Sequence, residues 1–134
     1  MSKLLLTLSL LLFTVPALSA TPTLKENMKE LGGLFKEIGK TVSDRTHNEA
    51  NAKSAARMNA IFVVVKTQVP DSLSTLPPGE RAAAIAEFQS MITTIAASAQ
   101  QLHDAFVAND NRAAADLVNS MNLGKRSGHD KFDK

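Results

Sequence analysis

The chain contains no cysteine, no tryptophan and no tyrosine, so phenylalanine is its only large aromatic residue. Without cysteine it forms no disulfide and offers no thiolate as a nucleophile or metal ligand. Without tryptophan and tyrosine it lacks the usual platforms on which nucleic-acid bases stack. The charge is nearly balanced, with 15 Lys and Arg against 13 Asp and Glu. The basic footprint of a nucleic-acid binder is therefore missing as well.

The motifs of the common enzyme classes are also missing. The sequence shows no recognisable Ser-His-Asp arrangement, and Gly32-Gly33 lacks the further glycine spacing of a phosphate-binding loop. No run alternates with the period of a β-strand, and no run reaches the length of a transmembrane helix. We therefore expect an all-α protein that is not an enzyme.

Residues 1–20 have the pattern of a secretory signal peptide. Lys3 gives a short positive start, Leu4 to Val15 form an apolar run, and residues 17–20 (ALSA) are a cleavage site of small residues. The apolar run is too short for a membrane anchor, so we expect an exported, periplasmic protein with no membrane insertion after cleavage. Residues 21–134, about 114 residues, then form one domain large enough to bury a core.

Four helical segments are predicted in residues 21–134. Pro22 and Thr23 suit a helix start, and apolar residues then recur at alternating spacings of three and four, which is typical of an amphipathic helix. The segments are about 23–42, about 48–69, from Gly79 or Glu80 to Phe106, and from the capping residues 109–111 to Phe132. A turn at 43–48 and a proline-containing loop at 70–79 separate the first three.

Four helices joined by short loops favour an up-down-up-down antiparallel four-helix bundle. In that topology the start of the first helix lies beside the end of the last. Met28 and His129 each lie about five residues from those ends, so at about 1.5 Å rise per residue both are expected roughly 7 Å from the same end of the bundle.

A thioether and an imidazole at matched depth are an axial ligand pair for haem iron. Taken singly, a methionine on an apolar stripe usually fills a core, and a histidine near a polar C-terminus is usually solvated. As a pair, Met28 and His129 predict a metal site in a haem-binding slot. The flanking residues are expected to be Leu24, Leu31, Phe88 and Phe132, with Lys125 able to reach a haem propionate.

Two glycines lie in the last predicted helix, on the stripe that leads to His129. Gly124 and Gly128 each cost about 1 kcal/mol relative to alanine inside a helix. Such a cost indicates either fraying of this helix or a bulky group packed against that face.

The residues around both predicted ligands resemble the cytochrome b562 family. Residues 24–31 (LKENMKEL) are similar to the L-x-x-N-M-x-x-L pattern of its opening helix, and residues 128–132 (GHDKF) to its closing H-x-K-aromatic segment. A departure is Asp133, which follows the aromatic residue where the family has an arginine soon after it. The resemblance implies a soluble periplasmic electron carrier, a monomer with one haem b, that passes electrons to a redox partner protein the sequence does not identify.

The chain also resembles the cytochrome c′ group, whose C-x-x-C-H motif near the C-terminus holds haem covalently. The corresponding residues here are 125–129 (KRSGH), which keep the histidine and lack both cysteines. By this resemblance the haem is non-covalent and b-type. Two alternatives remain open. One is a five-coordinate haem on His129 that binds a gas, with Met28 only lining the distal side. The other is a haem-free helical bundle that acts as a periplasmic binding or stress protein.

Overall fold

The computed structural model describes residues 20–132, apart from the side chain of Phe132. Within this range every regular element is helical, and the elements are α1 (Leu24–Thr41), a 3₁₀ turn (Arg45–His47), α2 (Asn48–Val65), α3 (Asp71–Ser74), α4 (Pro78–Val107) and α5 (Asn111–Phe132). The predicted signal peptide, except for Ala20, lies outside the described residues. Across residues 20–132, the search for a helix of the length and hydropathy needed to cross a membrane finds none.

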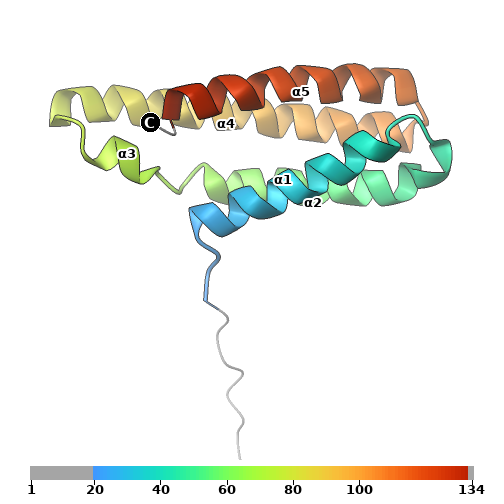
Figure 1. The fold of residues 1–134 in the computed structure, drawn as a ribbon, viewed down its shortest axis with the longest axis horizontal. Coiled ribbons are helices and arrows are strands. Elements are labelled where there is room, and N and C mark those ends of the chain that lie inside the picture. The colour runs from blue at the N-terminus through green and yellow to red at the C-terminus, as the bar shows by residue number, and fades with distance from the viewer. Residues whose placement is uncertain (1–19, 133–134) are drawn as a thin grey trace, which may run out of the picture.

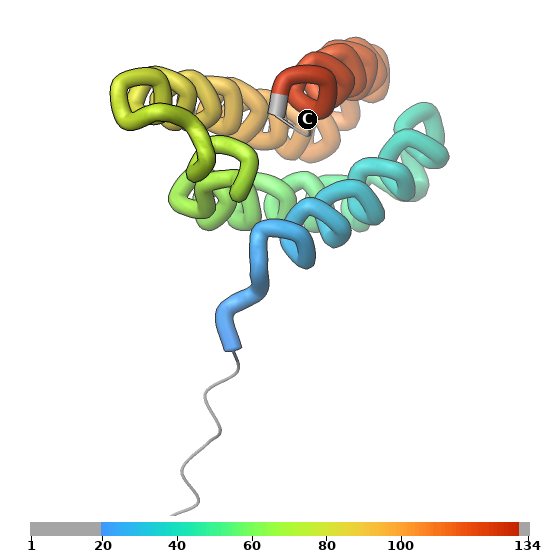
Figure 2. Tube along the Cα trace, turned by 60° about the vertical axis from the view of Figure 1, so that its left-hand side comes forward, coloured from blue at the N-terminus to red at the C-terminus, as the bar shows by residue number. Residues whose placement is uncertain are grey.

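The four long helices lie alongside one another, and each runs opposite to the one before it, with α3 in the connection between α2 and α4 (Figure 1). The tightest packing is between α2 and α4, while α1 packs on α2 and α5 packs on α4. Contact between α1 and α5 is slight. Figures 1 and 2 show these two helices close together where α1 ends and α5 begins, and apart at the opposite end.

We call the two ends of this helix pair the closed end and the open end. The closed end comprises Thr41–Asn51 and Asn109–Asn111, and the open end comprises Leu24–Leu31 and Gly124–His129. The core runs between them along the facing stripes of the helices, where burying one large apolar side chain contributes about 1.5–3 kcal/mol. Its largest fully buried side chains are Phe106, Ile38, Met58, Ile92, Leu102 and Val65.

The start of α1 and the start of α5 are capped as their sequences predict. Thr23 and Glu26 form a capping box, in which the Glu26 amide donates to Thr23 Oγ1 (3.2 Å) and the Thr23 amide donates to Glu26 Oε2 (2.7 Å). At α5, the Asp110 carboxylate accepts a hydrogen bond from the Ala113 amide (3.0 Å). Asn109 precedes this cap with φ of 54°, a left-handed conformation that asparagine tolerates at the end of a helix.

Some predicted boundaries are wrong. The second helix ends at Val65 instead of Val69. The amides of Thr67 and Gln68 donate to carbonyls three residues back, at Val64 and Val65, so the chain leaves the α-helix through a tightened turn before it reaches Pro70. The third begins at Pro78, since proline is well suited to the first position of a helix. The connection between α2 and α4 also contains the single helical turn α3. Pro70 does not prevent this turn, because it lies just before the first helical residue, where no helical hydrogen bond needs its missing amide proton.

The α5 helix continues without a break through Gly124 and Gly128. A Cβ at Gly128 would lie 3.2 Å from both Sδ and Cε of Met91. The absence of a side chain at Gly128 therefore makes room for the bulky side chain of Met91, which is one of the two explanations that the sequence left open. A Cβ at Gly124 would meet nothing within 4 Å.

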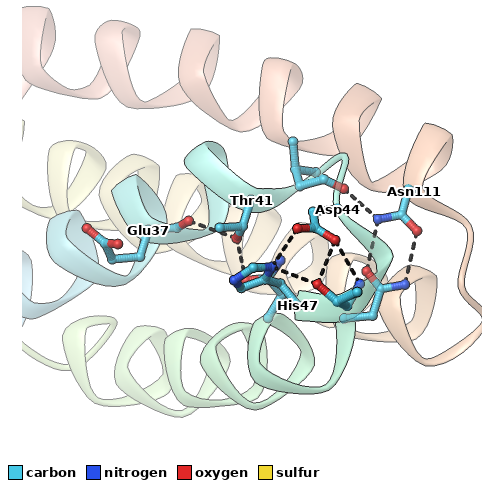
Figure 3. Close-up of polar contacts among 9 residues, drawn as sticks. Glu37, Thr41, Asp44, His47 and Asn111 are labelled. Atoms are coloured by element: carbon cyan, nitrogen blue, oxygen red, sulfur yellow. Dashed lines mark hydrogen bonds and ion pairs between the residues drawn. The ribbon is translucent and has the colours of Figure 1, made fainter.

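Polar side chains fasten the closed end (Figure 3). Asn48 is only 5% exposed, and its Nδ2 donates to Asn109 Oδ1 (2.9 Å) and Asn111 Oδ1 (3.0 Å). Asn111 in turn donates to Asn48 Oδ1 (2.9 Å) and to the carbonyl of Val42 (2.6 Å). These four residues, the asparagine cluster, thus connect the start of α5 to α2 and to the end of α1. Nearby, Asp44 pairs with His47 Nδ1 (3.1 Å) on the exposed turn.

Candidate functional site

A cavity of about 1070 Å³ opens between α1 and α5 at the open end. This volume lies close to the upper end of the range of about 300–1,000 Å³ that is usual for small-molecule and cofactor sites. Its wall comes from α1, α2, α4 and α5, and α3 contributes at the rim. The apolar lining consists of Leu24, Met28, Leu31, Phe35, Phe62, Val69, Pro70, Phe88, Met91, Ile92, Ile95 and Met121.

Met28 and His129 both line this cavity, from the two helices that flank it. Met28 is 39% exposed although it belongs to the apolar stripe of α1, because α5 does not pack over it at this end. His129 lies on an exposed turn near the end of α5. The structure also brings Leu24, Leu31, Phe88 and Lys125 to the cavity. The side chain of Phe132, the remaining predicted residue, lies outside the described part of the chain.

Hydrogen bonds to α2 and to the turn just after it fix the rotation of α1 and so determine which residues face the cavity. Asn27 is 4% exposed and donates to Gln68 Oε1 (2.8 Å), while Gln68 Nε2 donates to the carbonyl of Pro22 (2.8 Å). One turn further on, Arg57 donates to both carboxylate oxygens of Glu30, at 2.7 and 3.1 Å. With these residues turned toward α2, the neighbouring positions of α1 face the cavity.

Two carboxylates near the start of α1 are held in their charged form. The hydrogen bond from the Thr23 amide lowers the pKa of Glu26, with a further contribution from the Thr23 hydroxyl. The hydrogen bond from the Arg57 guanidinium lowers the pKa of Glu30. Both are engaged by partners on the protein. The charged side chains that line the cavity are instead Lys25, Lys29 and Lys125, together with Asp71 on α3.

Several cavity residues were not predicted from the sequence. Lys25 and Gly32 lie three residues before and four after Met28, so the helical period could have placed them beside it, and Lys29 follows Met28 directly in the chain. Met121 is 5% exposed and lines the cavity as well as the core. Phe62, Met91 and Asp71 come from other elements, and no local signal could have found them.

The arrangement defines an all-helical protein with an apolar cavity flanked by one thioether and one imidazole. Among residues 20–132, no group of three or more His, Asp or Glu side chains is placed to hold a metal ion. Comparisons with protein-family models, with curated proteins and with solved structures gave no match for this chain. The function is therefore inferred from the cavity and its chemistry.

Proposed function

We propose that this chain is an exported, periplasmic electron-transfer protein and not an enzyme. It is an up-down-up-down four-helix bundle that binds one non-covalent haem b between α1 and α5, with Met28 and His129 as axial ligands. The observation that carries the proposal is that these two side chains line one apolar cavity from the two helices flanking it. The protein acts as a monomer toward a redox partner.

The residues of the cavity fit this cofactor. A thioether and an imidazole are too few protein ligands for a bare metal ion, but they suffice for an iron whose other ligands come from a macrocycle. Gly32 on α1 and Gly124 on α5 both line the cavity, and a Cβ on either would meet nothing within 4 Å. The two flanking helices therefore leave space for a flat, wide ligand between them.

Each part of the cavity has a role in this function. Held by Met28 and His129, a haem would supply single-electron transfer and would leave no position on its iron for a substrate. The Met28 sulfur would raise the reduction potential relative to a second imidazole. Leu31, Phe88 and Ile92, each at most 5% exposed, keep water from the floor of the cavity. The exposed rim at the open end gives a partner access to the edge of the ligand.

A haemin titration followed by reduction tests the proposal. The purified protein is expected to show the sharp bands of a low-spin haem. Met28→Leu and His129→Ala are each expected to remove these bands and to weaken haem binding by more than about tenfold, or about 1.4 kcal/mol. Met58→Leu and His103→Ala are the matched controls, because both residues lie outside the cavity lining. Both controls should keep the wild-type spectrum.

Other results would contradict the proposal in distinct ways. A protein that stays colourless in haemin would favour the haem-free binding or stress function. Rapid carbon monoxide binding by the reduced protein, with bands unchanged in Met28→Leu, would favour a five-coordinate, gas-binding haem on His129. Bands unchanged in both Met28→Leu and His129→Ala would place the haem elsewhere.

A further inference from the structure

Three lysines stand at the rim of the cavity. Lys25 and Lys29 lie on α1, on either side of Met28, and Lys125 lies on α5, one turn before His129. All three are exposed. Each predicted axial ligand thus has positive charge within about one helical turn, and the charge faces the cavity from both flanking helices.

These three lysines have no anionic partner among residues 20–132. Other charged side chains near the cavity are held by hydrogen bonds or ion pairs. Glu26 is engaged by Thr23, Glu30 by Arg57, and Lys131 by Glu87. No ion pair or hydrogen bond of the described protein involves the side chains of Lys25, Lys29 or Lys125. Lys25 and Lys29 are four residues apart on one helix, where like charges repel each other.

The elements that pack around the cavity add little negative charge to balance the rim. From α2 and α4 the lining is apolar, consisting of Phe62, Phe88, Met91, Ile92 and Ile95. The one acidic lining residue is Asp71, on the α3 side of the opening. The positive charge therefore belongs to the gap between α1 and α5, and an anionic group placed there would be attracted by lysines from both helices.

We propose that the cavity binds ligands that combine an apolar body with a carboxylate, and that Lys25, Lys29 and Lys125 form the subsite for that carboxylate. The apolar wall takes the body, and the exposed rim takes the charged group. This inference rests on the proposed function, because haem carries propionates and is therefore one ligand of this class. A long-chain fatty acid has the same chemistry and is the other source.

Haemin and its dimethyl ester separate the carboxylate from the rest of the ligand. Exposed ion pairs are individually weak, so three lysines are expected to favour haemin over the ester by about tenfold in Kd at low salt. The preference should shrink in 1 M salt, where charges are screened beyond about 3 Å. In Lys25→Gln/Lys29→Gln/Lys125→Gln it should disappear, while the reduced bands that report Met28 and His129 stay unchanged.

A second triple variant controls for net charge. Lys40→Gln/Lys53→Gln/Lys66→Gln removes the same charge from exposed lysines outside the cavity lining and should keep the tenfold preference. Dodecanoate and dodecanol, titrated into haem-free protein by calorimetry, test the fatty-acid source. Tighter binding of dodecanoate, lost in the first triple variant only, would support the same subsite for lipid.

The outcomes separate this inference from the proposed function. Haemin that binds with Met28-dependent and His129-dependent bands, but no more tightly than its ester, would overturn the lysine subsite and leave the haem function standing. Dodecanoate binding without haemin binding would overturn the haem function and keep the subsite. Failure of both ligands, or equal loss of the preference in the two triple variants, would overturn the subsite.

Discussion

At the closed end, the asparagine cluster connects α5 to α2 and, through the Val42 carbonyl, to the end of α1. At the open end, the same helices α1 and α5 are separated by a cavity of about 1070 Å³ lined mostly by apolar side chains. One helix pair is thus joined by hydrogen bonds at one end and parted by apolar surface at the other. Directional polar contacts hold the helices in register at the closed end, while the open end exposes apolar side chains to the cavity.

The sharpest way to test this difference is to truncate two phenylalanines of the same helix. Phe106 is 1% exposed near the end of α4, and Phe88 is 5% exposed and lines the cavity. Phe106→Ala is expected to lower the free energy of unfolding by about 3–5 kcal/mol. Phe88→Ala should lower it less, because part of its surroundings is already cavity and fewer contacts are lost.

Urea unfolding of the haem-free variants measures both losses. A loss in Phe88→Ala equal to or greater than that in Phe106→Ala would mean that the open end is as tightly packed as the closed end. With haem bound, the two losses should approach each other, because the proposed ligand packs on Phe88.

Removal of the asparagine cluster is the next largest expected effect. Asn48→Ala removes the three side-chain hydrogen bonds that Asn48 makes with exposed Asn109 and half-buried Asn111, which is expected to cost about 1–3 kcal/mol. Asn119→Ala is the matched control, since Asn119 is exposed on α5 and should change stability by less than about 0.5 kcal/mol. Equal urea midpoints for the two variants would show that the cluster does not stabilise the closed end.

A pair of glycine substitutions should raise stability while affecting the cavity differently. Gly124→Ala and Gly33→Ala each place a methyl group where nothing lies within 4 Å, and each should stabilise its helix by about 1 kcal/mol. Only Gly124 lines the cavity, so only Gly124→Ala should weaken haem binding, by about 1 kcal/mol or more. Unchanged haem affinity in Gly124→Ala would mean that the ligand does not occupy this face of α5.

The smallest expected effect concerns the start of α1. Hydrogen bonding to Thr23 lowers the pKa of Glu26 from its ordinary value of 4.5, so its contribution to stability is present above pH 4.5. That contribution is lost as the pH falls through the lowered value in the folded state. Glu26→Gln should therefore unfold with a shallower acid dependence than the wild type. An equally steep fall in the free energy of unfolding with acid in the variant and the wild type would contradict this role of Glu26.

The predictable part of the fold is the part governed by local rules. The capping residues Thr23 and Asp110 start their helices as their side-chain chemistry requires. The second helix was predicted four residues too long: the sequence placed its end at Pro70, whereas the chain already leaves the α-helix through a tightened turn after Val65. The turn α3 depends on the burial of Leu73, which is 6% exposed. Four residues are too few to show a periodic pattern, so the sequence did not predict this turn.

The candidate site divides in the same way. Met28, Leu31 and Lys125 could be placed at the cavity from helical period and chain direction. Met91 and Phe62 reach the cavity through the packing of α4 and α2, which the sequence of α1 and α5 does not reveal. The exposure of Met28 was also beyond the sequence, since an apolar stripe residue is normally expected inside.

By itself the sequence determined the helices, their caps and the apolar stripes, because these depend on contacts within about one helical turn. The tertiary structure alone decided that α1 and α5 close at one end and part at the other. The reason is that the asparagine cluster joins residues 42, 48, 109 and 111 across elements, whereas at the open end side chains of α1, α2, α4 and α5 line a cavity and α1 does not pack on α5. The cavity that Met28 and His129 line results from these contacts between elements far apart in the sequence.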